Sequence, residues 1–206
     1  MPLVINSTEF NPALATSISG AHSNTGGQEL VAFLAHPIAA GAPSLVQYGG
    51  INLTSIQAQA VSNNVRAHIL RLSSPAAESN TFSVQWPGAT DGIAVCANWP
   101  ESKGILQSTG GTQTVDTSGS LATTSNTELA SKIYMIFAGA NLSAFTETSG
   151  ATLIHSQENT SALYEKAGTG GVVTFTWTIG LSARDMAFAL CEIGNRTGGN
   201  QVIWIR

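Results

Sequence analysis

Charged residues are scarce in this sequence. Only 10% of its 206 residues are Asp, Glu, Lys or Arg, against about 25% in an average soluble domain. The eight Lys and Arg residues are scattered along the chain, and the formal net charge is −4. Nucleic-acid binding depends on clustered cations that neutralise phosphates, so no nucleic-acid partner is expected.

Cysteines and long apolar runs are also scarce. The two cysteines, Cys96 and Cys191, show no CxxC or other metal-ligand spacing and cannot build a disulfide framework. Each lies inside an apolar stretch, which predicts a buried, inert thiol rather than a nucleophile. No window approaches about eighteen uninterrupted apolar residues, so no membrane span is expected. Residues 1–9 lack a basic segment followed by an apolar one, and we expect a mature chain made in a cytosol without a cleaved signal.

Motifs with recognisable chemistry are absent as well. The sequence contains no P-loop, HExxH, EF-hand or GxSxG motif. The glycine-rich run 168–171 precedes a strand pattern rather than a helix, which favours a turn over a phosphate cradle. His22, His36, His68 and His155 are far apart, and the acidic residues lie mostly in predicted turns, so no carboxylate pair for glycoside hydrolysis stands out. We predict no enzyme, no catalytic residue, no metal and no cofactor.

Alternation of apolar and polar residues is the clearest positive signal. In residues 173–179 four apolar side chains alternate with threonines, the period of a strand with one buried face. A second alternating segment, residues 186–191, follows after the short link 180–185, and together they predict a hairpin. Gly49 and Gly50 between two β-prone segments predict another hairpin.

Further strands are predicted throughout the chain. They cover residues 13–20, 29–35, 45–48, 51–56, 65–72, 81–86, 93–99 and 129–138, with 3–5 as a candidate strand. The last of these could instead be a helix capped by Thr127, but its β-prone residues favour a strand. The low-complexity run 107–126 is expected to hold one polar strand near 113–116.

These segments predict an all-β fold with about ten strands and little helix. At this spacing, with polar turns, a two-sheet antiparallel sandwich is expected, a jelly roll in the first place and an immunoglobulin-like array in the second. We predict a single β-sandwich domain over residues 1–206, with 1–12 as an N-terminal lead-in and 194–206 as a C-terminal extension.

Four segments of the first half are echoed in the second. Residues 28–35 resemble 127–138, 50–57 resemble 150–157, 81–86 resemble 172–177 and 91–96 resemble 185–191. The last match places Cys96 and Cys191 at equivalent positions. A structural repeat would explain the echo, although all β-sandwich strands alternate alike.

Aromatic residues near loops are candidates for sugar contacts. Sandwich proteins hold sugars by stacking on exposed rings, and Tyr48, Trp86, Trp99 and Tyr164 are candidates in that sense. Trp86 and Trp177 alternate in step with apolar neighbours and are expected in the core. Among the other candidates, Tyr48 and Trp99 are the predicted glycan contacts, and Trp99 is favoured because it ends a strand before Pro100.

One segment has a familiar pattern. Residues 46–54 resemble the TYGGxxLT hairpin of β-sandwich modules found in bacteriophage virion proteins and bacterial surface proteins. In those modules the hairpin is followed by three further features. They are a strand like residues 65–72, a TVTVTW strand like 81–86, and a closing pair of strands like 173–178 and 187–193. The loop usually written NPPAG is 73–77 here and departs from that pattern. The resemblance covers residues 19–193 and implies attachment, decoration or display without catalytic residues.

Two functions from different classes follow. The first is a non-enzymatic virion protein, most readily a capsid decoration (cement) or tail-associated protein, which would be a homo-oligomer bound to other virion proteins such as the major capsid or tail proteins. The alternative is a carbohydrate-binding or adhesin module with a glycan ligand. Neither requires a membrane.

The C-terminal residues form a short apolar run after a turn-prone linker. Gln201–Arg206 contains Ile203, Trp204 and Ile205, which are β-prone. We expect this run either to pair within its own domain, for example with residues 3–6, or to dock as a strand on a partner protein.

Overall fold

In the residues that it describes, the computed structural model contains β-strands joined by turns and loops, and no helix. It describes residues 3–11, 14–26, 29–37, 41–61, 65–139, 145–157, 161–179 and 184–196. The strands of the first half are β1 (Asn6–Phe10), β2 (Ala15–Ser23), β3 (Glu29–Pro37), β4 (Leu45–Tyr48), β5 (Ile51–Asn52), β6 (Thr54–Val61), β7 (Val65–Ser73), β8 (Ser79–Thr90) and β9 (Ile93–Asn98). Those of the second half are β10 (Ser102–Asp116), β11 (Ser118–Ala122), β12 (Lys132–Gly139), β13 (Phe145–Glu147), β14 (Thr152–Gln157), β15 (Ser161–Ala167), β16 (Thr174–Ile179) and β17 (Arg184–Asn195).

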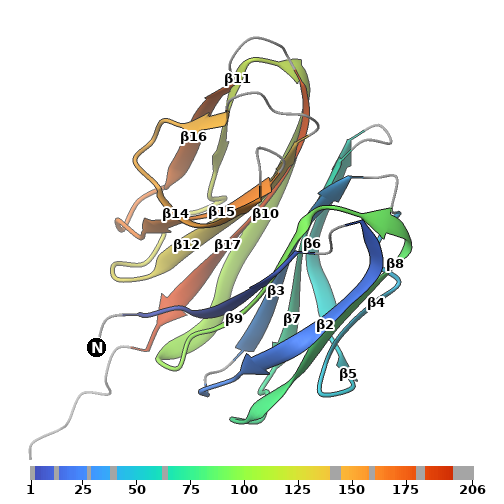
Figure 1. Cartoon of the computed structure of the whole chain (residues 1–206). Helices are drawn as coiled ribbons and strands as arrows, with labels where there is room; N and C mark the ends of the chain where they lie inside the picture. The colour runs from blue at the N-terminus through green and yellow to red at the C-terminus, as the bar shows by residue number, and fades with distance from the viewer. Residues whose placement is uncertain are drawn as a thin grey trace, which may run out of the picture.

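The strands form four antiparallel sheets stacked in four layers (Figure 1). The outer N-terminal sheet has the order β2-β8-β4-β5, and the inner N-terminal sheet has the order β1-β9-β3-β7-β6. The inner C-terminal sheet is β10-β17-β12-β15-β14, and the outer C-terminal sheet is β11-β16-β13. Each half of the chain is thus a sandwich with its own core, and the two inner sheets face each other across a third, shared core.

The inner sheets explain why several strands are apolar without interruption. All six residues of β9 are buried, and the described side chains of β3 and β17 are buried on both faces except at their ends. A strand covered on both sides needs apolar residues at every position, whereas a strand with one solvated face alternates. β8 and β16, in the outer sheets, show that alternation of buried and more exposed residues.

The two halves have the same topology, which confirms the repeat. In the inner sheets β1, β9, β3, β7 and β6 correspond in order to β10, β17, β12, β15 and β14. In the outer sheets β2, β8 and β4 correspond to β11, β16 and β13. Each of the four echoed segments falls on such a pair of strands. The chain is therefore an internal duplication of one sandwich unit.

Each unit has the winding of a jelly roll. The first strand lies beside the last one, β1 beside β9, and the second beside the second-last, β2 beside β8. This nesting of early and late strands is produced when a long antiparallel ribbon wraps around a sandwich. The prediction of an all-β antiparallel, jelly-roll-like sandwich is confirmed. The structure differs in having two such units: its described residues form seventeen strands in four sheets, where about ten strands in two sheets were expected.

One predicted hairpin is present and another is wrong. The Gly49–Gly50 turn joins β4 and β5, which pair Tyr48 with Ile51, and both glycines have positive φ (57° and 79°). By contrast, β16 and β17 belong to different sheets and do not pair. Their apolar side chains meet face to face across the C-terminal core, where the rings of Trp177 and Phe188 stack at 4.0 Å.

Strand positions near the chain start and in the low-complexity run also differ from the prediction. The first strand is Asn6–Phe10, not residues 3–5. Residues 107–126 contribute to two strands, the long β10 and the short β11, instead of one polar strand. Both β10 and β11 lie at a sheet edge, where polar and glycine-rich sequences are tolerated because one side of the strand is unpaired.

The cysteines are not at equivalent positions. Cys96 pairs with Ala32 and faces the N-terminal core, whereas Cys191 pairs with Tyr134 and faces the shared core. The residue of β17 that occupies the place of Cys96 is Leu190, which faces the C-terminal core. A shift of one residue moves a side chain to the opposite face of a strand, so matching the two cysteines by sequence put them out of register.

Corresponding edge strands meet at both ends of the seam between the two halves. At one end β10 lies over β6, where a Cβ on Gly110 would sit 2.8 Å from Gln57 Nε2 and 2.5 Å from Gln59 Cγ. At the other end β1 meets β14 through side-chain hydrogen bonds. Glycine at position 110 therefore permits the close approach of β10 to β6.

Candidate functional site

The two aromatic residues predicted to contact glycans are both buried. Tyr48 is 3% exposed, and its hydroxyl donates hydrogen bonds to the carbonyl oxygens of His22 (3.0 Å) and Glu78 (2.7 Å). Trp99 has no exposed surface and lies in the shared core. Neither ring is available to a glycan, so this prediction is corrected: the strand end before Pro100 faces the other half of the chain rather than solvent.

Trp99 is part of a polar chain that crosses the shared core. Its Nε1 donates to the Tyr134 hydroxyl (2.9 Å), which in turn donates to Glu165 Oε2 (2.6 Å). Burial raises the pKa of the Tyr134 hydroxyl, and the hydrogen bond to Glu165 acts in the same direction. Lys132 forms an ion pair with the other oxygen of this carboxylate (2.5 Å). The chain satisfies every buried polar group along its path, as a low-dielectric interior requires.

Two histidines form a buried stack at one end of the N-terminal core. The rings of His36 and His68 are 5.4 Å apart and nearly parallel, and Trp86 packs edge-on against His36. His68 Nε2 is buried and has no hydrogen-bond partner among the described residues. Burial lowers the pKa of His68 to about 3, and His36 and Arg66 act in the same direction. This histidine is neutral at pH 7 and serves as a packing residue.

This burial predicts acid sensitivity. Between the usual histidine pKa of 6.5 and about 3, the unfolded chain binds a proton at position 68 that the folded chain excludes. The free energy of unfolding therefore decreases as the pH falls below 6.5. The expected decrease from this histidine is about 2 kcal/mol between pH 7.5 and pH 5. Urea denaturation at the two pH values measures the loss. In His68→Leu the difference between the two pH values should shrink by that amount; an unchanged difference would contradict the assignment.

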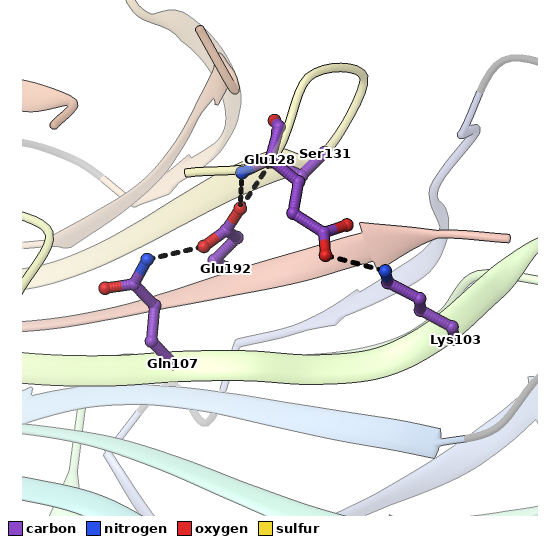
Figure 2. A network of polar contacts seen from close by, with 5 residues as sticks. All are labelled: Lys103, Gln107, Glu128, Ser131 and Glu192. Atoms are coloured by element: carbon purple, nitrogen blue, oxygen red, sulfur yellow. Dashed lines mark hydrogen bonds and ion pairs between the residues drawn. The ribbon is translucent and has the colours of Figure 1, made fainter. Parts of the chain in front are cut away.

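A buried carboxylate anchors the loop that precedes β12 (Figure 2). Glu192 of β17 is 1% exposed and accepts hydrogen bonds from the Glu128 backbone N–H (2.7 Å), from Ser131 Oγ (2.6 Å) and from Gln107 Nε2 (2.5 Å). Lys103 pairs with the side chain of Glu128 at the surface. Because three donors already use the oxygens of Glu192, this carboxylate is structural.

In the first half, an amide side chain holds the corresponding loop in place of the carboxylate. Asn98 occupies the position of Glu192, since it pairs with Asn6 of the first strand as Glu192 pairs with Gln107. Its Nδ2 donates to the Gly26 carbonyl (2.7 Å), which lies in the loop before β3. The duplication has therefore kept one function for this position, to hold the loop before the third strand.

Glu29 connects the two halves. One of its carboxylate oxygens pairs with Arg71 of the neighbouring strand (3.1 Å), and the other accepts the backbone N–H of Ile105 from β10 (2.9 Å). Like Glu192, this largely buried acid is used by the fold. Its contacts were not predicted, because its partners are 42 and 76 residues away in sequence.

His155 lies at the other edge of the seam with two partners from β1. Its Nε2 is 2.9 Å from Ser7 Oγ and its Nδ1 is 2.8 Å from Glu9 Oε2. The side chains of His155 and Glu9 remain 20% and 23% exposed. No sequence motif marks this group, since Ser7 and Glu9 lie near the start of the chain and His155 lies 146 or more residues later.

Both cysteines are free, buried thiols. Burial raises the pKa of Cys96 and of Cys191, and the carboxylates of Glu29 and Glu192 add to the effect at Cys191. A thiol with a raised pKa is a poor nucleophile. The predicted buried state of both side chains is confirmed.

Each half has a shallow groove between its edge strands. The groove of the second half, about 260 Å³, is lined by Phe137, Phe145, Leu153, Ser156, Ser161, Ala162 and Tyr164. Phe145 and Tyr164 are half-buried with ring centroids 5.9 Å apart. The groove of the first half, about 190 Å³, has no aromatic residue in its lining. Tyr164 is thus the one sequence-predicted sugar-contact candidate that lies at a groove.

The outer sheets present faces without charged side chains. Six of their seven strands (β2, β4, β5, β8, β11 and β16) contain no Asp, Glu, Lys or Arg. In β13 the one acid, Glu147, accepts the backbone N–H groups of Ser149 and Ala151. Serine and threonine dominate the outward positions, and the hydroxyl of Thr176 in β16 is hydrogen-bonded to that of Thr148, the residue just after β13 (2.9 Å). The two faces lie on opposite sides of the four-layer stack (Figure 1).

The remaining predicted site lies outside the described residues. Ile203, Trp204 and Ile205, proposed as a docking strand, belong to residues 197–206, which the structure does not describe. In the described part of the chain no three His, Cys, Asp or Glu side chains are grouped to hold a metal ion. The same part contains no helix of the length and apolarity needed to span a membrane.

Comparison with known proteins adds no assignment. The chain matches no protein-family model, no curated protein and no solved structure.

Proposed function

We propose that the protein is a structural component of a bacteriophage virion, a capsid decoration or tail-associated protein that works through its outer faces. The uncharged outer sheets carry this proposal. Lys, Glu and Asp are depleted in the buried centres of protein interfaces, because desolvating a charge is costly. A serine- and threonine-rich face loses less when a neighbouring subunit covers it.

The architecture supports the same role. Three cores stacked between four sheets give a thick, stiff body, and its two uncharged faces point in opposite directions. A body of this kind can be held between two neighbours. The resemblance of residues 46–54 to modules of virion proteins favours a particle as the place of assembly, with the protein made in the cytoplasm of the host.

Incorporation into particles tests the proposal. Quantitative mass spectrometry of particles purified from the strain that carries the gene should find the protein at a fixed copy number relative to the major capsid protein. Ser120→Lys combined with Thr178→Lys places two charges on the outer C-terminal sheet, where both side chains are exposed. We expect this double variant to keep its melting temperature and to lose incorporation at least tenfold.

A matched control separates charge from position. Thr112 is an exposed threonine on β10, outside the outer sheets, and Thr112→Lys should be incorporated normally. Absence of the protein from purified particles would overturn the virion role. Normal incorporation of the double variant would overturn the role of this face.

Glycan binding is the second candidate function, and the groove at Tyr164 favours it. The half-buried ring of Tyr164, beside serine hydroxyls, can stack on the apolar face of a sugar and hydrogen-bond to its hydroxyl groups. Saturable binding on a glycan array that Tyr164→Ala abolishes would support this function. Binding that the substitution leaves unchanged would exclude the groove.

A further inference from the structure

Ser7, His155 and Glu9 are arranged as a nucleophile, a base and an orienting acid. Ser7 and Glu9 are two residues apart on β1, opposite Ala97 and Val95, so both side chains leave the sheet on its shared-core side. His155 reaches them from β14 of the other half. The distances of 2.9 Å (Ser7 Oγ to His155 Nε2) and 2.8 Å (His155 Nδ1 to Glu9 Oε2) are those of two hydrogen bonds in series.

The hydrogen bonds fix the direction of proton transfer. An ionised carboxylate only accepts hydrogen bonds, so Glu9 takes the N–H of His155 at Nδ1. In the neutral ring Nε2 is then the acceptor, and Ser7 donates its hydroxyl hydrogen to it. A serine whose proton points at a basic ring nitrogen, with the ring held by a carboxylate, is the arrangement that activates a hydroxyl as a nucleophile.

The duplicated half provides an internal comparison. In β10, Ser108 and Gly110 take the places of Ser7 and Glu9, since they pair with Cys191 and Ala189 as the β1 residues pair with Ala97 and Val95. In β6, Gln57 takes the place of His155: it pairs with Ile69, the counterpart of Leu163.

The second edge of the seam is thus closed with a serine, a glutamine and a glycine. The corresponding strands, β10 and β6, pack there without a base or an acid, so the fold does not require the histidine and the carboxylate. Because the histidine and the carboxylate are present at only one of two equivalent edges, packing of the edge strands does not explain them.

The geometry points to Ser7 as a nucleophile that accepts an acyl group from a carboxylic ester, with His155 as its general base and Glu9 as a positioning residue. Ser7 Oγ bonds to the ester carbonyl carbon while its proton passes to His155 Nε2. The same proton leaves with the alkoxide as an alcohol. Water, deprotonated by Nε2, then releases the acyl group as a carboxylic acid and restores Ser7.

The surroundings of Ser7 favour a small acyl group. Ile5 and Ile154, neighbours of the triad in sequence, are partly buried and pack against the shared core. The side chains of His155 and Glu9 themselves are only about one-fifth exposed (20% and 23%). A short acyl chain such as acetyl can enter such a site, whereas a polymer backbone would have to remain outside it.

A serine-directed fluorophosphonate and p-nitrophenyl acetate test the inference on the full-length protein. Peptide mass mapping should show that the fluorophosphonate modifies Ser7 at least 100-fold faster than Ser108, the matched serine at the other edge. Ser7→Ala should abolish modification at this site and hydrolysis of the acetate. His155→Gln, which copies Gln57, should slow both by about 100-fold or more, the range of a general base.

The role of the acid has its own readout. Glu9→Gln keeps a hydrogen-bond acceptor of the same shape but removes the charge, so a packing role would survive it. We expect its modification rate to fall at least tenfold, with partial recovery in Glu9→Asp. Melting temperatures verify that each variant is folded. Equal modification of Ser7 and Ser108 in the unmutated protein, or a Ser7 rate unchanged in folded His155→Gln, would overturn the inference.

Discussion

Replacing Trp99 with alanine is expected to lower the free energy of unfolding by about 3–5 kcal/mol, the usual cost of removing a large buried aromatic residue. Its ring has no exposed surface and packs against Phe33 and Tyr134, with centroid distances of 6.3 and 5.0 Å. The two neighbours belong to different halves, so the cavity would open in the core that joins them. The loss should appear as one cooperative transition shifted to lower denaturant.

Urea denaturation followed by circular dichroism measures this effect. Trp99→Phe keeps most of the ring volume and loses the hydrogen bond to the Tyr134 hydroxyl (2.9 Å), so a cost of about 1–2 kcal/mol is expected. Leu129→Ala, at a leucine that is 73% exposed, should cost less than about 0.5 kcal/mol. A loss for Trp99→Ala no larger than for Leu129→Ala would show that the shared core does not hold the halves together.

The outer and inner sheets differ in how well their sequences revealed them. Residues 173–179 alternate because one face of β16 is solvated, and that strand was predicted with its buried side correct. Residues of β9 and β17 are apolar at successive positions, and the sequence analysis treated them as ordinary sandwich strands. An uninterrupted run of apolar residues is typical of a strand buried on both faces. These two runs therefore indicated that a second sandwich covers the first.

Register and pairing partners were beyond the reach of the sequence. Two alternating segments separated by a short link predict a hairpin, yet β16 and β17 lie in different sheets because a jelly roll crosses from sheet to sheet at this point. Periodicity identifies a buried face but not the strand that lies beside it. For the same reason the cysteines were matched one residue out of register.

The functional groups depend on contacts distant in sequence. Trp99 ends a strand before Pro100, which in an isolated sandwich would place it at a rim. The second sandwich turns that rim into a core. The Ser7–His155 hydrogen bond joins residues 148 apart, and only the duplication, which brings β1 and β14 together, makes it foreseeable. Glu192 and Asn98 show the converse, because a topological comparison reveals their common role while their residue types differ.

Trp177→Ala is expected to lower the free energy of unfolding by about 3–5 kcal/mol. The side chain is 1% exposed, stacks on Phe188 at 4.0 Å and lies 6.3 Å from Phe145. Its Nε1 also donates to Gln113 Oε1 (3.2 Å) at the edge of the sheet. Phe175→Ala, at a fully buried ring on the same face of β16, should cost a similar amount.

Thr176 lies between these two residues and provides the control. Its side chain points to the opposite face of the strand, is half-exposed and is hydrogen-bonded to the hydroxyl of Thr148, the residue just after β13 (2.9 Å). Removing the Thr176 hydroxyl and its hydrogen bond should lower the free energy of unfolding by less than about 1 kcal/mol. Thr176→Ala should therefore leave the denaturation midpoint close to that of the unmutated protein. Because this threonine is part of the uncharged outer face, a cost as large as that of Trp177→Ala would mean that the face is already covered within the molecule. In that case it would not be free to bind a neighbour, and the virion proposal would lose its support.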